Sequence, residues 1–273
     1  MKNFEKIATD VIEKELAGLS LLKASMPKDF ENAASAISSM KGRLIVSGIG
    51  KSGYIGQKIS ASFSSTGTRS FYIHPAEASH GDLGMIGDED IVLLLSNSGE
   101  TKELLDIISY CKRFSIPIVG MTMQQDSVLA RSSTYILNIP IAEEASSVNA
   151  PTTSSTMMLA LGDALVVSVH EHKGFSREDF AIYHPGGKLG ASLLKIGSIM
   201  HKGEKIPSVL IGTKMSNAIL EMTGKGFGCT AVVDSYNKIL GIVTDGDLRR
   251  HMSSLLIDDN VDNNLLCSIV SFS

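Results

Sequence analysis

The sequence has few cysteines and no marked excess of charge of either sign. Cys111, Cys229 and Cys267 are odd in number, widely spaced and without a CxxC pair. This pattern argues against a disulfide framework and against a thiolate zinc site, and it favours a reducing, cytoplasmic location. The formal net charge of −4 gives no overall basic footprint, so nucleic acid is not an expected partner.

Long apolar segments are also lacking. No apolar run approaches the roughly 20 residues that a membrane helix requires, so we expect no membrane partner. Residues 1–6 carry an acidic side chain and no uninterrupted apolar core, unlike a signal peptide. The chain has 273 residues, of which 43% are hydrophobic, and this is enough for one large and one small domain.

The first 194 residues alternate short apolar runs with amphipathic segments. Residues 91–95 are apolar on both faces, as expected of a buried parallel strand. Five such runs with helical connections predict a doubly wound α/β sandwich around a five-stranded parallel sheet. The predicted strands cover residues 43–46, 70–73, 91–95, 116–121 and 135–139, and the helices after them cover residues 54–65, 102–114, 128–131 and 152–172.

Two helical patterns precede the first strand. Apolar residues recur at three- and four-residue steps from Phe4 to Leu22, and Pro27 ends this pattern. A second pattern covers residues 30–40. We expect these helices either to cap the sheet or to face a second subunit.

The residues past 194 predict a small α+β unit. A helix at 215–223 is followed by a strand at 229–234, a turn at 236–237, a second strand from residue 239, and a final helix. We therefore divide the chain into residues 1–194, residues 195–256, and a tail at 257–273 without usable periodicity.

Two turns rich in glycine and hydroxyl groups follow predicted strands, at residues 47–53 and 96–101. The turns that follow parallel strands meet at one edge of the sheet, where ligands bind. Glycines let the backbone approach an anion, and the amides of a helix start donate to phosphate oxygens. Two such turns favour a phosphate site within reach of Lys51 over ordinary capped turns. Neither turn has the spacing of a Walker loop or a dinucleotide fingerprint.

Other candidate residues lie in polar loops. His74 and His80 share one loop with two acids; their spacing of six is not a helical metal-ligand spacing, so a polar active-site loop is favoured over a metal site. Glu103 and Glu144 are each candidates, although a helix-dipole partner and a solvated acid are the plainer interpretations. His184 precedes Pro-Gly-Gly, where a rigid loop suits a residue that delivers a proton.

In the small unit, residues 241–248 place a threonine and two acids where a strand passes into a helix. Such a group suits the ribose and phosphates of a nucleotide. A capped helix start is the equally plain alternative.

These residues resemble a known family. Residues 1–194 resemble the sugar isomerase (SIS) domain, of flavodoxin-like fold, and five motifs in order resemble the D-arabinose 5-phosphate isomerases. The motif Gly-Ile-Val-Thr-Asp-Gly-Asp-Leu-Arg-Arg at 241–250 resembles a CBS module. The five motifs are Gly-Ile-Gly-Lys-Ser-Gly at 48–53, His-Pro-x-Glu-Ala-x-His-Gly-Asp-Leu-Gly at 74–84, Ser-Asn-Ser-Gly-Glu-Thr at 96–101, Ala-Pro-Thr-x-Ser-x-Thr at 150–156 and His-Pro-Gly-Gly-x-Leu-Gly at 184–190.

The resemblance implies an aldose–ketose isomerase that interconverts D-ribulose 5-phosphate and D-arabinose 5-phosphate for synthesis of an eight-carbon acid sugar. It implies catalytic roles for Lys51, Glu103, Glu144 and His184, and an inhibitory rather than required zinc at His74. It also implies self-association as a dimer or tetramer, and it leaves the nucleotide at the CBS motif as the possibility stated above. The substrate and its phosphate are assigned to Ser52, Gly67, Thr68, His80, Ser96, Asn97, Ser98, Gly99, Glu100 and Thr101.

The sequence departs from the family pattern in two places. The loop after Glu144 lacks the usual Cys-Pro and is one residue shorter, and only one CBS motif precedes the tail, in which residues 262–267 resemble a remnant of a second. Two rival interpretations follow. One is a non-catalytic sugar-phosphate sensor, although no basic helix-turn-helix segment precedes residue 43, and the other is a decayed isomerase.

Overall fold

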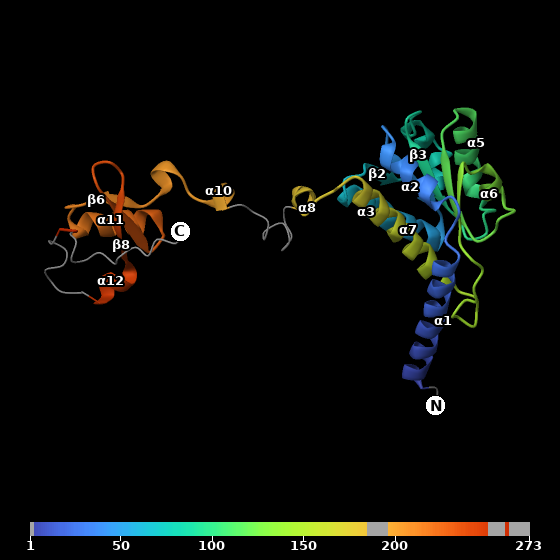
Figure 1. Ribbon diagram of the computed structural model, residues 1–273, viewed down its shortest axis with the longest axis horizontal. Coiled ribbons are helices and arrows are strands. Elements are labelled where there is room, and N and C mark those ends of the chain that lie inside the picture. The colour runs from blue at the N-terminus through green and yellow to red at the C-terminus, as the bar shows by residue number, and fades with distance from the viewer. Residues whose placement is uncertain (1–2, 185–195, 251–259, 262–273) are drawn as a thin grey trace. The chain divides into compact units, whose positions relative to one another are not determined.

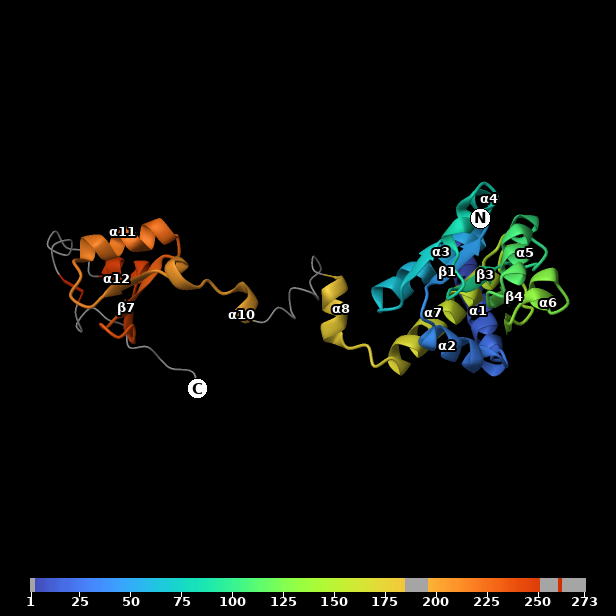
Figure 2. The ribbon, with the colours of Figure 1, turned by 90° about the horizontal axis from the view of Figure 1, so that it is seen from above.

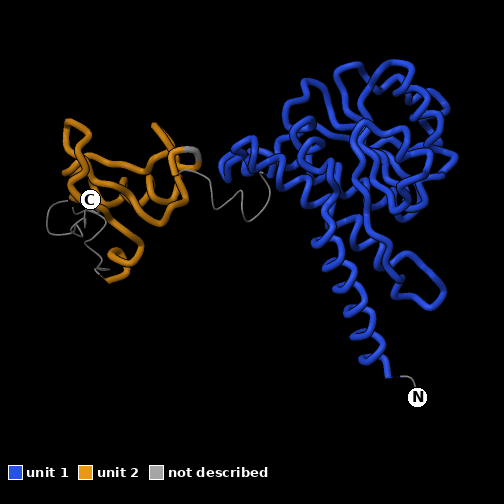
Figure 3. Tube along the Cα trace, turned by 45° about the vertical axis from the view of Figure 1, so that its right-hand side comes forward, with its two compact units in different colours: residues 1–193 blue, residues 194–273 orange. Residues whose placement is uncertain are grey.

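The computed structural model describes residues 3–184, 196–250 and 260–261, and it divides into two compact units, residues 1–193 and 194–273 (Figure 3). The loop after His184 and most of the predicted tail lie outside the described residues. Within these ranges no helix is both long and apolar enough to cross a membrane.

The first unit is built on a five-stranded parallel sheet (Figure 1). Its strand order is β2-β1-β3-β4-β5. This order, with the reversal between β1 and β3, confirms the predicted flavodoxin-like, doubly wound fold. The strands are β1 (Leu44–Gly48), β2 (Ser70–Tyr72), β3 (Ile91–Leu95), β4 (Ile118–Thr122) and β5 (Tyr135–Asn138).

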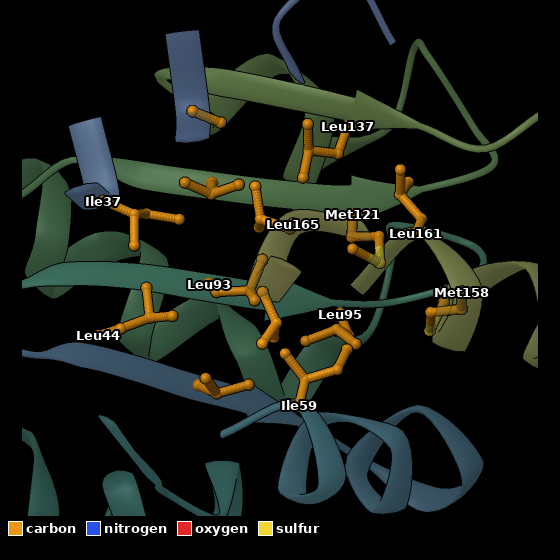
Figure 4. Close-up of a cluster of buried hydrophobic side chains, with 14 of the residues drawn as sticks. Ile37, Leu44, Ile59, Leu93, Leu95, Met121, Leu137, Met158, Leu161 and Leu165 are labelled. Atoms are coloured by element: carbon orange, nitrogen blue, oxygen red, sulfur yellow. The ribbon is translucent and has the colours of Figure 1, made fainter. Parts of the chain in front are cut away.

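Helices cover both faces of this sheet, so each face has its own apolar core. On one face the helices α1, α2, α3 and α7 pack against Leu44, Leu93 and Leu137 (Figure 4). On the other face α4, α5 and α6 pack against Ile45 and Leu94. The bounds are α1 (Phe4–Ala24), α2 (Phe30–Ser39), α3 (Gly50–Ser65), α4 (Pro75–Ala78), η1 (Asp82–Met85), η2 (Lys102–Leu104), α5 (Leu105–Arg113), α6 (Val128–Ser132), α7 (Thr153–His172) and α8 (Arg177–Tyr183).

The first helix has two different halves. Its second half is covered, because Leu22 is buried and Gly18 lies against Thr153 and Met157 of α7. Its first half extends away from the sheet, as Figures 1 and 3 show, and leaves Phe4 86% exposed and Ile12 58% exposed. The helix therefore caps the core with one half only.

The structure shifts several predicted boundaries in the first unit. The helix after β1 begins at Gly50 rather than at residue 54, so Lys51 lies in its first turn. The predicted helix 102–114 is a short 3₁₀ turn followed by α5. The strand predicted at 116–121 begins only after Pro117, which has no N–H for the ladder.

The second unit is a three-stranded sheet in the order β6-β7-β8. The hairpin of β7 (Cys229–Val233) and β8 (Ile239–Thr244) was predicted, and its turn contains Asn237 at positive φ. The strand β6 (Ser208–Leu210), parallel to β7, was not predicted because it has three residues and no buried alternation. The remaining elements are α10 (Ile196–Ile199), η3 (Gly203–Lys205), α11 (Met215–Lys225) and α12 (Asp245–Arg250).

The contact between α3 and α7 gives a testable packing prediction. A Cβ at Gly162 would lie 2.2 Å from Cδ1 and 2.6 Å from Cγ1 of the fully buried Ile59. We expect Gly162→Ala to lower the free energy of unfolding by about 1–3 kcal/mol through overpacking. Adding Ile59→Val, which removes Cδ1, should recover part of this loss in a urea-unfolding double-mutant cycle.

A matched control is available at Gly224, which is helical, exposed and has nothing within 4 Å of its added Cβ. Gly224→Ala should be neutral or stabilising by up to about 1 kcal/mol, because only helix propensity changes. Equal effects at both glycines would contradict the close packing of α3 on α7.

Candidate active site

A cavity of about 290 Å³ lies at the carboxyl edge of the first unit's sheet. It is formed by the turns after β1 and β3 and by the start of α7, which brings three separate parts of the sequence together. Lys51 and Ser52 line it from the first turn, Ser96, Asn97, Ser98 and Thr101 from the second, and Pro151, Ser154, Ser155 and Met158 from the start of α7.

A larger cavity of about 520 Å³ lies at the opposite, amino edge of the sheet, where Asp88 and Glu89 precede β3. None of the predicted site residues lines it. Ligands of open α/β sheets bind at the carboxyl ends of the strands, so the smaller cavity is the candidate active site.

The first turn holds Lys51 at the start of α3. Gly50, with φ +60°, adopts a left-handed conformation that favours glycine. The Tyr72 hydroxyl donates to the carbonyl of Gly48, and an added Cβ at Gly53 would lie 2.8 Å from that hydroxyl. Burial raises the pKa of the Tyr72 hydroxyl. The Tyr72 hydroxyl thus holds the backbone of the turn, while the side chain of Lys51 stays exposed.

The second turn is shaped by Ser96, which is only 2% exposed. Its hydroxyl accepts from the backbone N–H of Gly99 at 2.9 Å and shares a 2.7 Å hydrogen bond with the hydroxyl of Thr101. Asn97 and Ser98 are exposed at the tip of the turn. Ser96 therefore shapes the turn, and the exposed groups are the ones placed to meet a ligand.

Glu144 is tied to the start of α7. Its Oε2 accepts from the N–H and the hydroxyl of Thr152 at 2.8 Å and 3.0 Å, and from the N–H of Ser154 at 3.3 Å, while Oε1 accepts from the Ser154 hydroxyl. Partial burial raises the pKa of this carboxyl, but these hydrogen bonds outweigh it and hold the pKa below its ordinary range. The carboxylate thus caps α7 beside the cavity through Ser154.

Glu103, His74 and His80 also lie in segments at the carboxyl edge, outside the residues that line the cavity. Glu103 is exposed in η2, two residues after Thr101, and no hydrogen-bond partner is found for its carboxylate among the described residues. Nδ1 of His74 accepts from the N–H of Ala76 at 3.3 Å, as the cap of α4. The described part of the chain has no group of three His, Cys, Asp or Glu residues arranged to hold a metal, and a zinc ion at His74 stays a prediction.

The structure does not bring Gly67, Thr68 and His184 to this cavity. Gly67 and Thr68 follow the far end of α3, where Gly67 lies against Phe175 and Lys173 donates to Thr68 at 2.9 Å. His184 ends α8, beyond the far end of α7, a 20-residue helix about 30 Å long (Figures 1 and 2). Its ring stacks on Phe180 at 3.8 Å. The roles predicted for these three residues at the active site therefore stay predictions, because the three residues do not reach the cavity of their own chain.

Sequence reasoning missed the contribution of α7 to the cavity. The hydroxyl-rich segment at its start appears only as a family motif at 150–156 and supplied no predicted site residue, yet Ser154 and Ser155 line the cavity. One feature of the sequence could have indicated this contribution, which is that the hydroxyl-rich run directly follows the loop of Glu144.

The candidate nucleotide motif of the second unit forms a capped helix start. The N–H and the hydroxyl of Thr244 donate to Asp247 at 2.9 Å and 2.7 Å, and Asp247 also pairs with Arg250. These bonds support the capping interpretation, and a nucleotide there stays a prediction.

Comparison with known proteins places this geometry in a class. Residues 37–168 match the family model of the SIS domain, and residues 196–254 match that of the CBS domain. The cavity between two hydroxyl-rich turns thus belongs to a SIS-domain protein. Both matches fall within the predicted divisions at 1–194 and 195–256.

Individual relatives are more specific. The chain is 47% identical to the arabinose 5-phosphate isomerase KdsD of Pseudomonas aeruginosa, over 91% of this chain and 77% of that protein. It is 53% identical to an uncharacterized protein of Rickettsia prowazekii over 92% of this chain and 78% of that one. A solved structure of the c3406 protein of E. coli CFT073, in complex with arabinose 5-phosphate, matches with a TM-score of 0.65 and 39% identity, over 68% of this chain and 100% of that chain. The chain belongs to the family of the KdsD arabinose 5-phosphate isomerases, and the resemblance is confirmed.

The capping bonds of Glu144 predict a pH-dependent stability. Because its pKa is lowered in the folded state, its stabilisation is present above the ordinary value of 4.5 and is lost as the pH falls through the folded-state pKa. We expect Glu144→Ala to lower the free energy of unfolding by about 1–2 kcal/mol at pH 7. The gap between variant and wild type should shrink in urea unfolding at acid pH.

Glu103→Ala is the matched control, because Glu103 is an exposed glutamate near the same sheet edge without a hydrogen-bond partner in the described ranges. It should stay within about 0.5 kcal/mol of wild type. A difference for Glu144→Ala that does not change with pH would show that the carboxylate form is not what caps α7.

Proposed function

We propose that the protein is an aldose–ketose isomerase that interconverts D-ribulose 5-phosphate and D-arabinose 5-phosphate. The observation that carries this proposal is one cavity that combines a hydroxyl-rich turn suited to phosphate with the exposed amine of Lys51. The names of the KdsD relatives and the sugar phosphate in the c3406 structure support the substrate.

The reaction needs a base, an acid and a stabilised intermediate. A base removes a proton from the carbon beside the carbonyl, and an enediol(ate) forms. A proton then returns to the former carbonyl carbon, while the neighbouring hydroxyl loses its proton and becomes the new carbonyl. Lys51 is assigned the stabilisation of the negative oxygen, and His184 and one glutamate are assigned the proton transfers.

The contacts of the two glutamates favour Glu103 as the proton-transfer group. Its carboxylate is exposed and unbonded within the described residues, whereas that of Glu144 is occupied by bonds from Thr152 and Ser154. A pKa below the ordinary range also makes Glu144 a weaker base. Glu144 is therefore assigned to the position of Ser154, which lines the cavity.

Self-association completes this site in our proposal. Since His184 follows the far end of α7, it reaches a cavity only if that cavity belongs to another subunit. The exposed apolar half of α1, with Phe4 and Ile12, supports burial against a second copy. A dimer or tetramer with shared sites follows.

The remaining assignments are also proposals. The reaction as written requires no cofactor, and a zinc ion at His74 would need ligands beyond those that the described residues gather there. A nucleotide at residues 241–248 would have a regulatory role. The free thiols of Cys111 and Cys229 support a reducing cytoplasm, and the product would supply synthesis of an eight-carbon acid sugar of the cell surface.

The activity is tested by a coupled assay for arabinose 5-phosphate formation. Wild type should convert D-ribulose 5-phosphate, and Lys51→Met should lower kcat by about 100-fold or more, because the charge on the intermediate loses its partner. Lys58→Met is the control, since Lys58 lies on the same helix but pairs with Asp163. Folded protein that binds the substrate without turnover would instead identify a sensor, and insoluble protein would favour the decayed isomerase.

The shared site is tested by mixing two inactive variants. Lys51→Met and His184→Ala subunits, unfolded and refolded together, should recover about one quarter of the wild-type rate if a dimer exchanges His184 reciprocally. Each mixed dimer then holds one intact site and one doubly altered site. No recovery, with mixed dimers present by native mass spectrometry, would place Lys51 and His184 in the same chain.

A further inference from the structure

The second turn of the cavity is bonded along its outer side to the segment that joins β4 to α6. This β4–α6 segment, residues 122–129, supplies three donors to the backbone carbonyls of the turn. The Asn97 carbonyl accepts from the Thr122 hydroxyl and the Met123 N–H, each at 3.2 Å, and the Gly99 carbonyl accepts from the Leu129 N–H at 3.0 Å.

These bonds set the direction of the backbone amides. In a trans peptide the C=O and the next N–H point to opposite sides. With the Asn97 carbonyl held by the β4–α6 segment, the N–H of Ser98 points away from it, and no acceptor for that N–H is found among the described residues. The N–H of Glu100 is turned in the same way, and its one acceptor within the described residues is the Ser98 hydroxyl at 3.2 Å. The turn thus presents donors on the side that an anion requires.

The carboxylate of Glu100 is held on the same outer side. Its Oε1 accepts from the N–H of Val128 at 2.8 Å, at the start of α6. A carboxylate free to face the cavity would repel a phosphate. The bond to Val128 instead uses this side chain as a tether between the turn and the β4–α6 segment.

Gly99 shows how close the two segments lie. It has φ +65°, and an added Cβ would lie 2.0 Å from Oγ of Ser127 and 2.4 Å from its Cβ. Ser127 is 3% exposed and is itself held, donating to the carbonyl of Gln124 at 2.7 Å and accepting from the N–H of Ala130 at 3.2 Å. The β4–α6 segment therefore has little freedom to move aside.

We propose that the β4–α6 segment presets the phosphate-binding turn, and that Glu100 is a positioning residue rather than a ligand of the phosphate. This inference rests on the proposed function for the identity of the turn. It revises the role predicted for Glu100 from the sequence, because the tether to Val128 occupies the carboxylate that was assigned to the substrate.

The test is binding of inorganic phosphate to the full chain by calorimetry, with the Val128 amide followed by hydrogen exchange. Glu100→Ala should weaken phosphate binding about five- to tenfold and speed exchange at Val128. Glu100→Gln keeps an acceptor oxygen and should restore both to within about twofold of wild type. Wild-type phosphate binding in Glu100→Ala, or equal weakening in both variants, would overturn the proposal.

A second pair of variants keeps the test independent of Glu100. Gly99→Ala should weaken phosphate binding, and adding Ser127→Gly, which removes the clashing atoms, should recover part of it. Gly174→Ala is the control for backbone strain, because Gly174 has the same φ of +65° with nothing within 4 Å of its added Cβ. No recovery in the double variant would overturn the proposed contact.

These measurements separate this inference from the proposed function. If wild type binds phosphate but does not interconvert the pentose phosphates, the isomerase proposal fails while the positioning role is still decided by the variants. If wild type binds no phosphate at all, the turn is not an anion site and the inference fails with it.

Discussion

The structure of the first unit depends on one constraint, which is that a parallel sheet must be covered on both faces. Its strands are apolar on both sides, so each connection must place a helix on one face or the other. Every strand then ends at the same edge. The turns containing Lys51 and Ser98 are brought together by this topology, although about fifty residues separate them in the sequence.

The backbone segments that form the cavity at that edge are held in place by groups that do not line the cavity. Tyr72 fixes the carbonyl of Gly48 under the first turn, and the β4–α6 segment fixes the carbonyls of Asn97 and Gly99 outside the second. Glu144 acts differently, because its carboxylate accepts from the amides and hydroxyls of Thr152 and Ser154 and so fixes the start of α7. At the two turns a backbone acceptor is satisfied on the outer side, which leaves backbone amides, hydroxyls and the Lys51 amine on the side of the cavity. An anion is the ligand that such a surface of donors favours.

The sequence predicted the architecture of the first unit well, because hydrophobic pattern alone determines it. The strand at 91–95 was predicted with its observed bounds, since it is apolar throughout and bordered by polar residues. The start of α3 was missed because Gly50 and Ser52 are typical of a loop, and no side chain caps this helix. The strand β6 was missed because its three residues are stabilised by pairing with β7, which no local pattern reveals.

For the candidate site, the sequence motifs predicted individual residues but not the contacts between them. Motif positions mark Lys51 and Ser98 as candidate site residues. They do not reveal that the carboxylates of Glu100 and Glu144 accept hydrogen bonds from backbone amides. Nor do they tell on which end of α7 a residue falls. A helix of 20 residues separates its two ends by about 30 Å, so Ser154 and His184 belong to opposite ends of the unit although only α7 and α8 lie between them. If both serve one reaction, the distance along α7 must be overcome by a second chain, and the length of that helix becomes a reason for the protein to self-associate.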